Sequence, residues 1–142
     1  MSVYQVKAKK NYEAAVHLVA KNESDNLYIP SAHLAYYSAF LIMKYALANF
    51  NSISYDQQDQ ITGSSASHTL LFLSFMDEIK KRVALGDAND YMVNYNRMQL
   101  IRQKADYKTD KSGLTHIVLK ENVDRAKTFY NNVATLYKFN QL

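Results

Sequence analysis

The stretch from Ser31 to Phe50, SAHLAYYSAFLIMKYALANF, decides the fold. Its apolar residues recur at helical spacing and occupy nearly every side of the predicted helix, so that helix has to be buried from several directions. We therefore expect it to be the central helix of a bundle. Its more polar members need partners inside the bundle, because buried polar groups are normally hydrogen-bonded. These members are His33, Tyr36, Tyr37, Ser38 and Lys44.

Two stripes run along this predicted helix. The larger stripe carries bulky side chains that we expect to lie in the core: Tyr36, Phe40, Met43, Leu47 and Phe50. The slimmer stripe carries smaller side chains that would let a neighbouring helix approach closely: Ala35, Ala39, Ile42 and Ala46. The pattern predicts a helix that contacts neighbours on more than one side.

The amino-acid composition limits the kinds of protein to which this chain can belong. A chain of 142 residues predicts a single domain spanning residues 1–142, large enough to bury a core without covalent staples. It has no cysteine, which excludes disulfides, thiolate metal sites and cysteine nucleophiles. No secretory leader or membrane span is apparent, so we expect a soluble cytoplasmic protein that does not associate with membranes. A net charge of +4 permits an anionic partner, and twelve tyrosines predict a core edge or groove lined with hydroxyls.

With one proline and three glycines, the chain predicts long helices joined by short loops. Pro30 and Ser31 supply a stop and a helix N-cap, and residues Thr115–Val118 are predicted to be extended. We expect an all-α fold, an up-and-down bundle of four or five helices. Besides Ser31–Phe50, the predicted helices are Val3–Lys21, His68–Val83, Asn89–Tyr107 and Lys120–Phe139, with a short helical turn at Tyr55–Ile61. In the first of these, we expect Tyr12, Ala15, Val16 and Val19 to form the buried face.

Familiar catalytic motifs are missing from the sequence. A di-iron carboxylate bundle needs two Glu-x-x-His pairs, but Glu13 and His17 are four residues apart and stand alone. Glycine-rich phosphate loops, HExxH and GxSxG are also absent, and nothing local supports a Ser/His/Asp relay. We therefore expect neither a metal nor a cofactor.

One face of the helix Asn89–Tyr107 combines charge with aromatic character. Arg102 and Asp106 are four residues apart and therefore neighbours, and Tyr95 lies two turns before Arg102 on the same side. This face can be a half-buried polar seam that binds a ligand. It can equally be an intrahelical ion pair without a function, which contributes about 0.3 to 0.5 kcal/mol to stability.

Four segments, in this order, resemble the HEPN family (higher eukaryotes and prokaryotes nucleotide-binding). They are AHLAYYSAFLIMKYAL, SHTLLFLSF, LIRQKADYKTD and ENVDRAKTFYNNV, and the likeness covers about residues 28–133. Its most distinctive pieces are Ala-Tyr-Tyr-x-Ala-Phe at 35–40 and Arg-x-x-Ala-Asp-Tyr at 102–107. The resemblance implies an up-and-down helical bundle, commonly dimeric. It implies either an RNase of toxin–antitoxin and other defence systems or a non-catalytic partner of a minimal nucleotidyltransferase.

Catalytic members of that family carry an Arg-x(4–6)-His motif, and this chain departs from it. Tyr107 stands where the nearest permitted histidine after Arg102 would be, and a tyrosine with a pKa of about 10 is a poor general base near neutrality. We therefore expect a homodimeric binding or accessory protein. Its partners would be RNA or a nucleotide, and a nucleotidyltransferase or antitoxin protein. Lys104 and Lys108 are expected to join Arg102 and Tyr107 in holding a phosphate.

The histidines lead to further predictions, and two alternative functions remain open. His33 and Tyr37 form a polar seam on the central helix, which we expect to lie near Arg102 or Asp106 across the bundle. We expect His68 to make a local contact at its helix start. One alternative function is a divergent metal-independent endoribonuclease that recruits His33 or His68 in space. Another is a purely structural protein-interaction module.

Overall fold

The computed structural model describes residues 1–20, 27–61 and 67–142. In this part of the chain the fold is all-α, as predicted, with six helices packed together and no strand. The helices are α1 (Val3–Val19), α2 (Ser31–Phe50), α3 (Tyr55–Ile61), α4 (Ser67–Lys80), α5 (Leu85–Tyr107) and α6 (His116–Tyr137).

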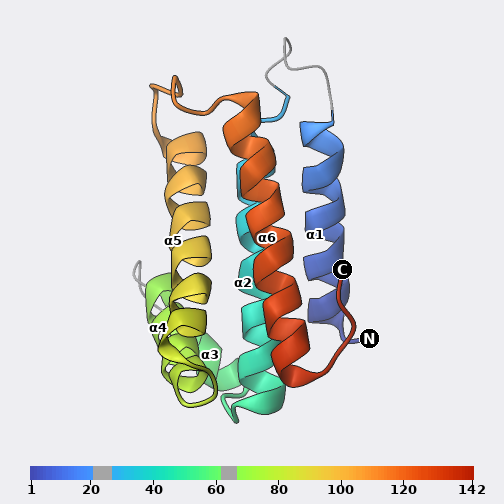
Figure 1. The fold of residues 1–142 in the computed structure, drawn as a ribbon, viewed down its shortest axis with the longest axis vertical. Helices are drawn as coiled ribbons and strands as arrows, with labels where there is room; N and C mark the ends of the chain where they lie inside the picture. The colour runs from blue at the N-terminus through green and yellow to red at the C-terminus, as the bar shows by residue number, and fades with distance from the viewer. Residues whose placement is uncertain (21–26, 62–66) are drawn as a thin grey trace.

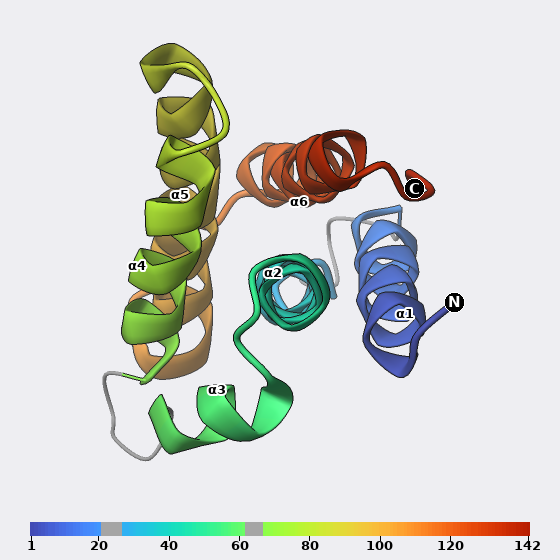
Figure 2. The ribbon, with the colours of Figure 1, turned by 90° about the horizontal axis from the view of Figure 1, so that it is seen from below.

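The predicted central position of α2 is confirmed. In the view along the bundle, α2 lies in the middle with the other five helices around it (Figure 2), and it packs against every one of them. The long helices α1, α2, α5 and α6 run along the longest axis of the molecule in alternating directions (Figure 1). The shorter α3 and α4 lie near one end of the bundle and cover α2 and α5 there.

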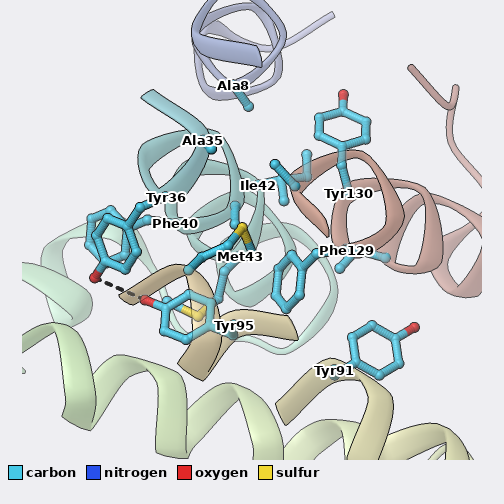
Figure 3. Packing of buried hydrophobic residues seen from close by; sticks show 14 of the residues in the cluster. Ala8, Ala35, Tyr36, Phe40, Ile42, Met43, Tyr91, Tyr95, Phe129 and Tyr130 are labelled. Carbon is cyan, nitrogen blue, oxygen red and sulfur yellow. Dashed lines mark hydrogen bonds between the residues drawn. The ribbon is translucent and has the colours of Figure 1, made fainter. Parts of the chain in front are cut away.

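Alanines on α2 allow α1 to pack closely. Ala35 is fully buried, and Figure 3 shows it facing Ala8 of α1, which is also fully buried. The hydroxyl of Ser38 donates a hydrogen bond of 2.8 Å to the carbonyl of Ala8, so a buried polar side chain on α2 is paired across the same contact. On another side of α2, Tyr36 and Met43 pack toward aromatic residues of α5 and α6 (Figure 3).

One predicted helix start, that of α6, and one predicted cap, that of α2, are wrong. The helix α6 begins at His116, because the Thr115 hydroxyl caps it by accepting a hydrogen bond of 3.2 Å from the Val118 N–H; residues 116–118 are therefore helical and not extended. Ser31 is the first residue of α2 and not its cap, since its hydroxyl donates to the Tyr28 carbonyl.

Further boundaries and burial also differ from the prediction. The helix α5 begins at Leu85, four residues earlier than expected, and α4 ends at Lys80. Phe50 and Val16, both expected in the core, are 37% and 39% exposed. The predicted helix end at Lys21 lies outside the described residues. No helix in the described ranges combines the length and hydropathy needed to cross a membrane.

Candidate functional site

Arg102 on α5 is the centre of the candidate site. Its Nε donates a hydrogen bond to Oδ2 of Asp106 at 3.2 Å, which is the ion pair expected from their spacing. Its Nη2 donates to the hydroxyl of Tyr107, also at 3.2 Å. Only 13% of the Arg102 side chain is exposed, so its charge lies at the edge of the protein interior.

Three tyrosine rings surround the guanidinium. The Cζ atom of Arg102 is 4.9 Å from the ring centre of Tyr36, 5.5 Å from that of Tyr37 and 5.7 Å from that of Tyr107. An arginine within about 6 Å of an aromatic ring is stabilised by the negative potential of the ring. We call these four residues the Arg102 cage.

His33 on α2 contacts both Tyr37 of the cage and Asp106 of α5. Its Nδ1 lies 3.0 Å from Oδ2 of Asp106, the same oxygen that accepts from Arg102. Its ring stacks on Tyr37 with 4.5 Å between centroids. The expected proximity of His33 and Tyr37 to Arg102 and Asp106 is therefore confirmed, while a binding role for these residues stays a prediction.

His68 at the start of α4 also reaches the cage. Its Nδ1 is 2.8 Å from the hydroxyl of Tyr36 on α2, and its ring stacks on Phe40 at 4.1 Å. The expectation of a local helix-start contact is wrong, because the partners come from another helix. Burial lowers the pKa of His68 below its usual 6.5, and the positive charges of Arg102 and Lys44 lower it further, so the imidazole is neutral at pH 7.

Tyr95 lies beneath the cage and not in it. Its side chain is fully buried, and the ring of Phe72 from α4 stacks on it at 4.0 Å. The hydroxyl of Tyr95 donates to that of Tyr36 at 3.1 Å (Figure 3). The prediction that Tyr95 contacts a ligand is not supported by this position, since Tyr95 supports Tyr36 from inside.

The three side chains form a hydrogen-bonded series. Because the Tyr36 hydroxyl accepts from Tyr95, it has a proton to donate to Nδ1 of His68. Burial raises the pKa of Tyr36 above 10, so the hydroxyl keeps its proton at neutral pH. The hydroxyl of the buried Tyr36 therefore both accepts and donates a hydrogen bond.

A hollow of about 390 Å³ lies where α2 and α5 meet, beside the Arg102 cage. Two of the residues that line it contact members of the cage: His33 stacks on Tyr37, and Asp106 accepts from Arg102. The hollow is mostly apolar, and Lys111 adds a positive charge to it. Its lining is Ile29, Pro30, His33, Leu34, Ala105, Asp106 and Lys111.

Lys104 and Lys108 are not brought to this site. They line a separate hollow of about 400 Å³, which shares no lining residue with the first. Lys104 follows Arg102 by two residues, which on a helix is a rotation of roughly 200°, so it leaves α5 on the opposite side. The spacing of the two residues along the helix was therefore sufficient to predict that Lys104 lies away from Arg102.

The contact between Tyr36 and His68, and their place beside Arg102, were not predicted. The ring of Tyr36 is buried, as expected for the core stripe, and its hydroxyl, which was expected to need a partner inside the bundle, contacts His68. His68 could not be placed beside Tyr36, because no sequence pattern fixes where α4 crosses α2.

Within the described residues, no group of three or more metal-ligating side chains is placed to hold an ion. Comparisons of the chain with models of protein families, with curated proteins and with solved structures give no match.

Proposed function

We propose that this protein is a HEPN-like nucleotide- or nucleic-acid-binding protein that holds a phosphate at Arg102. The observation that carries the proposal is the Arg102 cage: a guanidinium held between three tyrosine rings at the edge of a hollow that also carries His33 and Lys111. This arrangement combines a phosphate-binding cation with aromatic faces, the two elements that recognise single-stranded nucleic acid.

The hydrogen bonds of Arg102 indicate how a phosphate would enter. Asp106 accepts from Nε and orients the guanidinium, while the neutral hydroxyl of Tyr107 accepts from Nη2. A phosphate oxygen makes a stronger, charge-assisted bond than a hydroxyl does, so it would replace Tyr107 on Nη2. Tyr107 is 70% exposed and has room to turn away.

The aromatic residues would then receive a base. Tyr37 and His33 already stack on each other, and His33 lines the hollow. After its displacement, Tyr107 would offer a second ring face. Stacking of a base on an aromatic side chain contributes about 1 to 3 kcal/mol and tolerates any base, so we expect affinity for single strands with little sequence preference.

The biological setting follows from the resemblance. An up-and-down bundle that lacks the Arg-x(4–6)-His motif fits a non-catalytic accessory protein in the cytoplasm. We propose that it acts in a toxin–antitoxin, defence or nucleotidyltransferase system, with a nucleotidyltransferase or an antitoxin as its protein partner.

A binding titration tests this function. We expect a fluorescein-labelled single-stranded RNA of mixed sequence to bind the full chain, and binding to weaken as salt rises because counterions are released. Arg102→Ala should weaken binding at least tenfold, while Lys127→Ala, which removes an equal charge from the exposed surface of α6, should change it less than twofold. Circular dichroism would verify that both variants are folded. Absence of binding at low salt, for RNA and for mononucleotides, would overturn the proposal.

A second candidate function is a metal-independent endoribonuclease, and one observation favours it. Neutral His68 and cationic Arg102 both contact Tyr36, one through its hydroxyl and one over its ring. Substrate would first replace Tyr36 at Nδ1 of His68, because a neutral imidazole has only one acceptor nitrogen. Nδ1 would then take the proton of a ribose 2′-hydroxyl, whose oxygen attacks the adjacent phosphorus; the bond to the 5′-oxygen breaks, that oxygen takes a proton from water, and Arg102 stabilises the charge.

Incubation of the protein with a mixed RNA pool in EDTA separates the two candidates. Cleavage that is lost in both Arg102→Ala and His68→Ala would establish the enzyme. RNA that is bound but stays intact would leave the binding protein.

A further inference from the structure

Lys44 on α2 is a second cation at the edge of the protein interior. Only 12% of its side chain is exposed, a value close to the 13% of Arg102. Its Nζ lies 5.6 Å from the ring centre of Tyr4 on α1 and 5.7 Å from that of Phe40 on α2. These contacts with aromatic faces stabilise the charge at a position that little water reaches.

The ammonium group of Lys44 keeps hydrogen-bonding capacity for a ligand. Oδ1 of Asp59 on α3 is 3.7 Å from Nζ, which makes an ion pair but is longer than a hydrogen bond. In Figure 2, the long helices α1, α5 and α6 lie on three sides of α2 and the short α3 lies on the fourth, so Lys44 points to the fourth side. Among the described residues Nζ donates no hydrogen bond, although an ammonium has three N–H donors. A phosphate oxygen would therefore be a closer, charge-assisted acceptor.

One face of α2 connects Lys44 with the Arg102 cage. Each residue advances a helix by about 100°, so four residues of α2 lie within roughly 60° of one another: His33, Tyr37, Phe40 and Lys44. Arg102 lies over Tyr37 near the start of this row, and Lys44 stands at its end. Solvent reaches both ends, since 46% of the His33 side chain and 12% of the Lys44 side chain are exposed.

His68 lies between the two cations. Its ring stacks on Phe40, over which Lys44 is placed. Its Nδ1 contacts the hydroxyl of Tyr36, whose ring lies under Arg102. The pKa of His68 is lowered first by burial and then by the charges of Arg102 and Lys44, so both cations act on the same side chain.

The aromatic surroundings of Lys44 resemble those of the Arg102 cage. Tyr4 stacks on Tyr55 of α3, with 4.3 Å between the ring centres and 9° between the ring planes. A stacked aromatic pair also lies beside the Arg102 cage. Both Tyr4 and Tyr55 are partly exposed, so they offer an outer ring face to a base that follows a phosphate at Lys44.

We propose that Lys44 binds a second phosphate of the same nucleic-acid strand that Arg102 holds. This inference rests on the proposed function, because it extends the phosphate site at Arg102. The two cations cover different rings: Arg102 lies over Tyr36 and Lys44 over Phe40, and these ring centres are 6.1 Å apart. A strand offers two phosphates separated by a nucleoside, whereas a mononucleotide with one phosphate engages Arg102 alone. The strand then runs along α2 from the Arg102 cage toward α3.

Titrations with two probes separate the second phosphate from the first. The probes are a fluorescein-labelled RNA octanucleotide and uridine 5′-monophosphate. Lys44→Gln should weaken RNA binding at least fivefold and reduce its salt dependence by about 0.7 in the slope of log K against log salt, the contribution of one phosphate contact in a single strand. It should change the affinity for the mononucleotide less than twofold, whereas Arg102→Ala should weaken the binding of both probes. Lys127→Gln, at an exposed position of α6, should leave the RNA affinity and the salt slope unchanged.

The outcomes distinguish this inference from the proposed function. RNA binding that requires Arg102 but is as strong and as salt-dependent in Lys44→Gln as in Lys127→Gln would overturn the inference and leave the proposed function standing. An equal loss of mononucleotide and RNA affinity in Lys44→Gln would also overturn it, because both cations would then hold the same phosphate. A wild-type chain that binds no RNA at low salt would overturn both.

A second variant tests the same site without removing a covered side chain. Asp59→Asn removes a negative charge beside Lys44 at a side chain that is 70% exposed, so the fold should be preserved. Because the carboxylate repels a phosphate bound at Lys44, RNA should bind this variant about threefold more tightly at low salt. Asp124→Asn, the same change at an exposed position of α6, should alter the affinity less than twofold. Equal RNA affinities of the two variants would contradict a phosphate at Lys44.

Discussion

Tyr36 shows how one side chain can serve both the core and the surface. Its ring is fully buried against Tyr95 and Phe40, and Arg102 lies over it. Its hydroxyl joins Tyr95 to His68, so the polar end is paired although no part of the residue is exposed. Such a fully satisfied network fixes the position of the arginine above it, since displacing Tyr36 would break both hydrogen bonds.

His68 should titrate below pH 6.5, and Arg102→Ala should raise its pKa, because a neighbouring positive charge is removed. The charge-matched Lys127→Ala should leave it unchanged. Histidine resonances followed by NMR over pH 4 to 8 give both values, with His68→Gln to assign the signal. A His68 that titrates at or above 6.5, or that ignores the loss of Arg102, would contradict this arrangement.

The lowered pKa of His68 also makes the stability of the fold depend on pH. A histidine with a lowered pKa binds its proton less readily in the folded protein than in the unfolded chain. Its contribution to the free energy of unfolding is therefore complete above pH 6.5 and declines as the pH falls through that value toward the folded pKa. Replacing His68 by glutamine should make stability less dependent on pH in this window.

At the scale of single residues, the sequence predicted contacts within one helix better than contacts between helices. Spacing within one helix predicted the Arg102–Asp106 pair, which the structure contains. It also placed Tyr95 on the same side as Arg102, but not under Phe72, because the covering ring comes from α4. Contacts between helices depend on crossing positions that no local pattern encodes.

At the scale of the elements, the contact of α1 with α2 depends on small side chains. Ala8 and Ala35 face each other with no exposed surface, and the Ser38 hydroxyl is bonded across the same contact. A larger side chain at this contact has no space to occupy, because protein interiors are close-packed.

Ala35→Leu should therefore lower the free energy of unfolding by about 1 to 3 kcal/mol through overpacking. Ala14→Leu, the same change at an exposed position of α1, should alter it by less than about 0.5 kcal/mol. Urea unfolding followed by circular dichroism measures both. Equal stabilities of the two variants would show that α1 does not pack closely on α2.

The sequence predicted the existence of the long helices more reliably than their ends. The apolar spacing of residues 31–50 was sufficient for α2, because it extends over five turns. The start of α6 was missed because one hydroxyl, that of Thr115, converts an apparently extended segment into the first turn of a helix. The helix α5 starts at Leu85, before the predicted Asn89, and includes Gly86, a residue type that disfavours the interior of a helix.

At the scale of the whole molecule, α5 presents two different surfaces. One side contributes Arg102 and Asp106 to the candidate site with α2, and the other carries the exposed side chains of Val93 and Leu100. Tyr107 accepts a hydrogen bond from Arg102 and is 70% exposed, so it lies at the border between the two sides.

The central claim is that Arg102 holds a phosphate, and NMR of the arginine side chains tests it most directly. The chain contains four arginines, at positions 82, 97, 102 and 125, so single substitutions can assign each Nε–Hε signal. On titration with single-stranded RNA, we expect the Arg102 signal to shift and the other three to stay in place. RNA binding that moves any of the other three signals and leaves that of Arg102 unchanged would contradict the account.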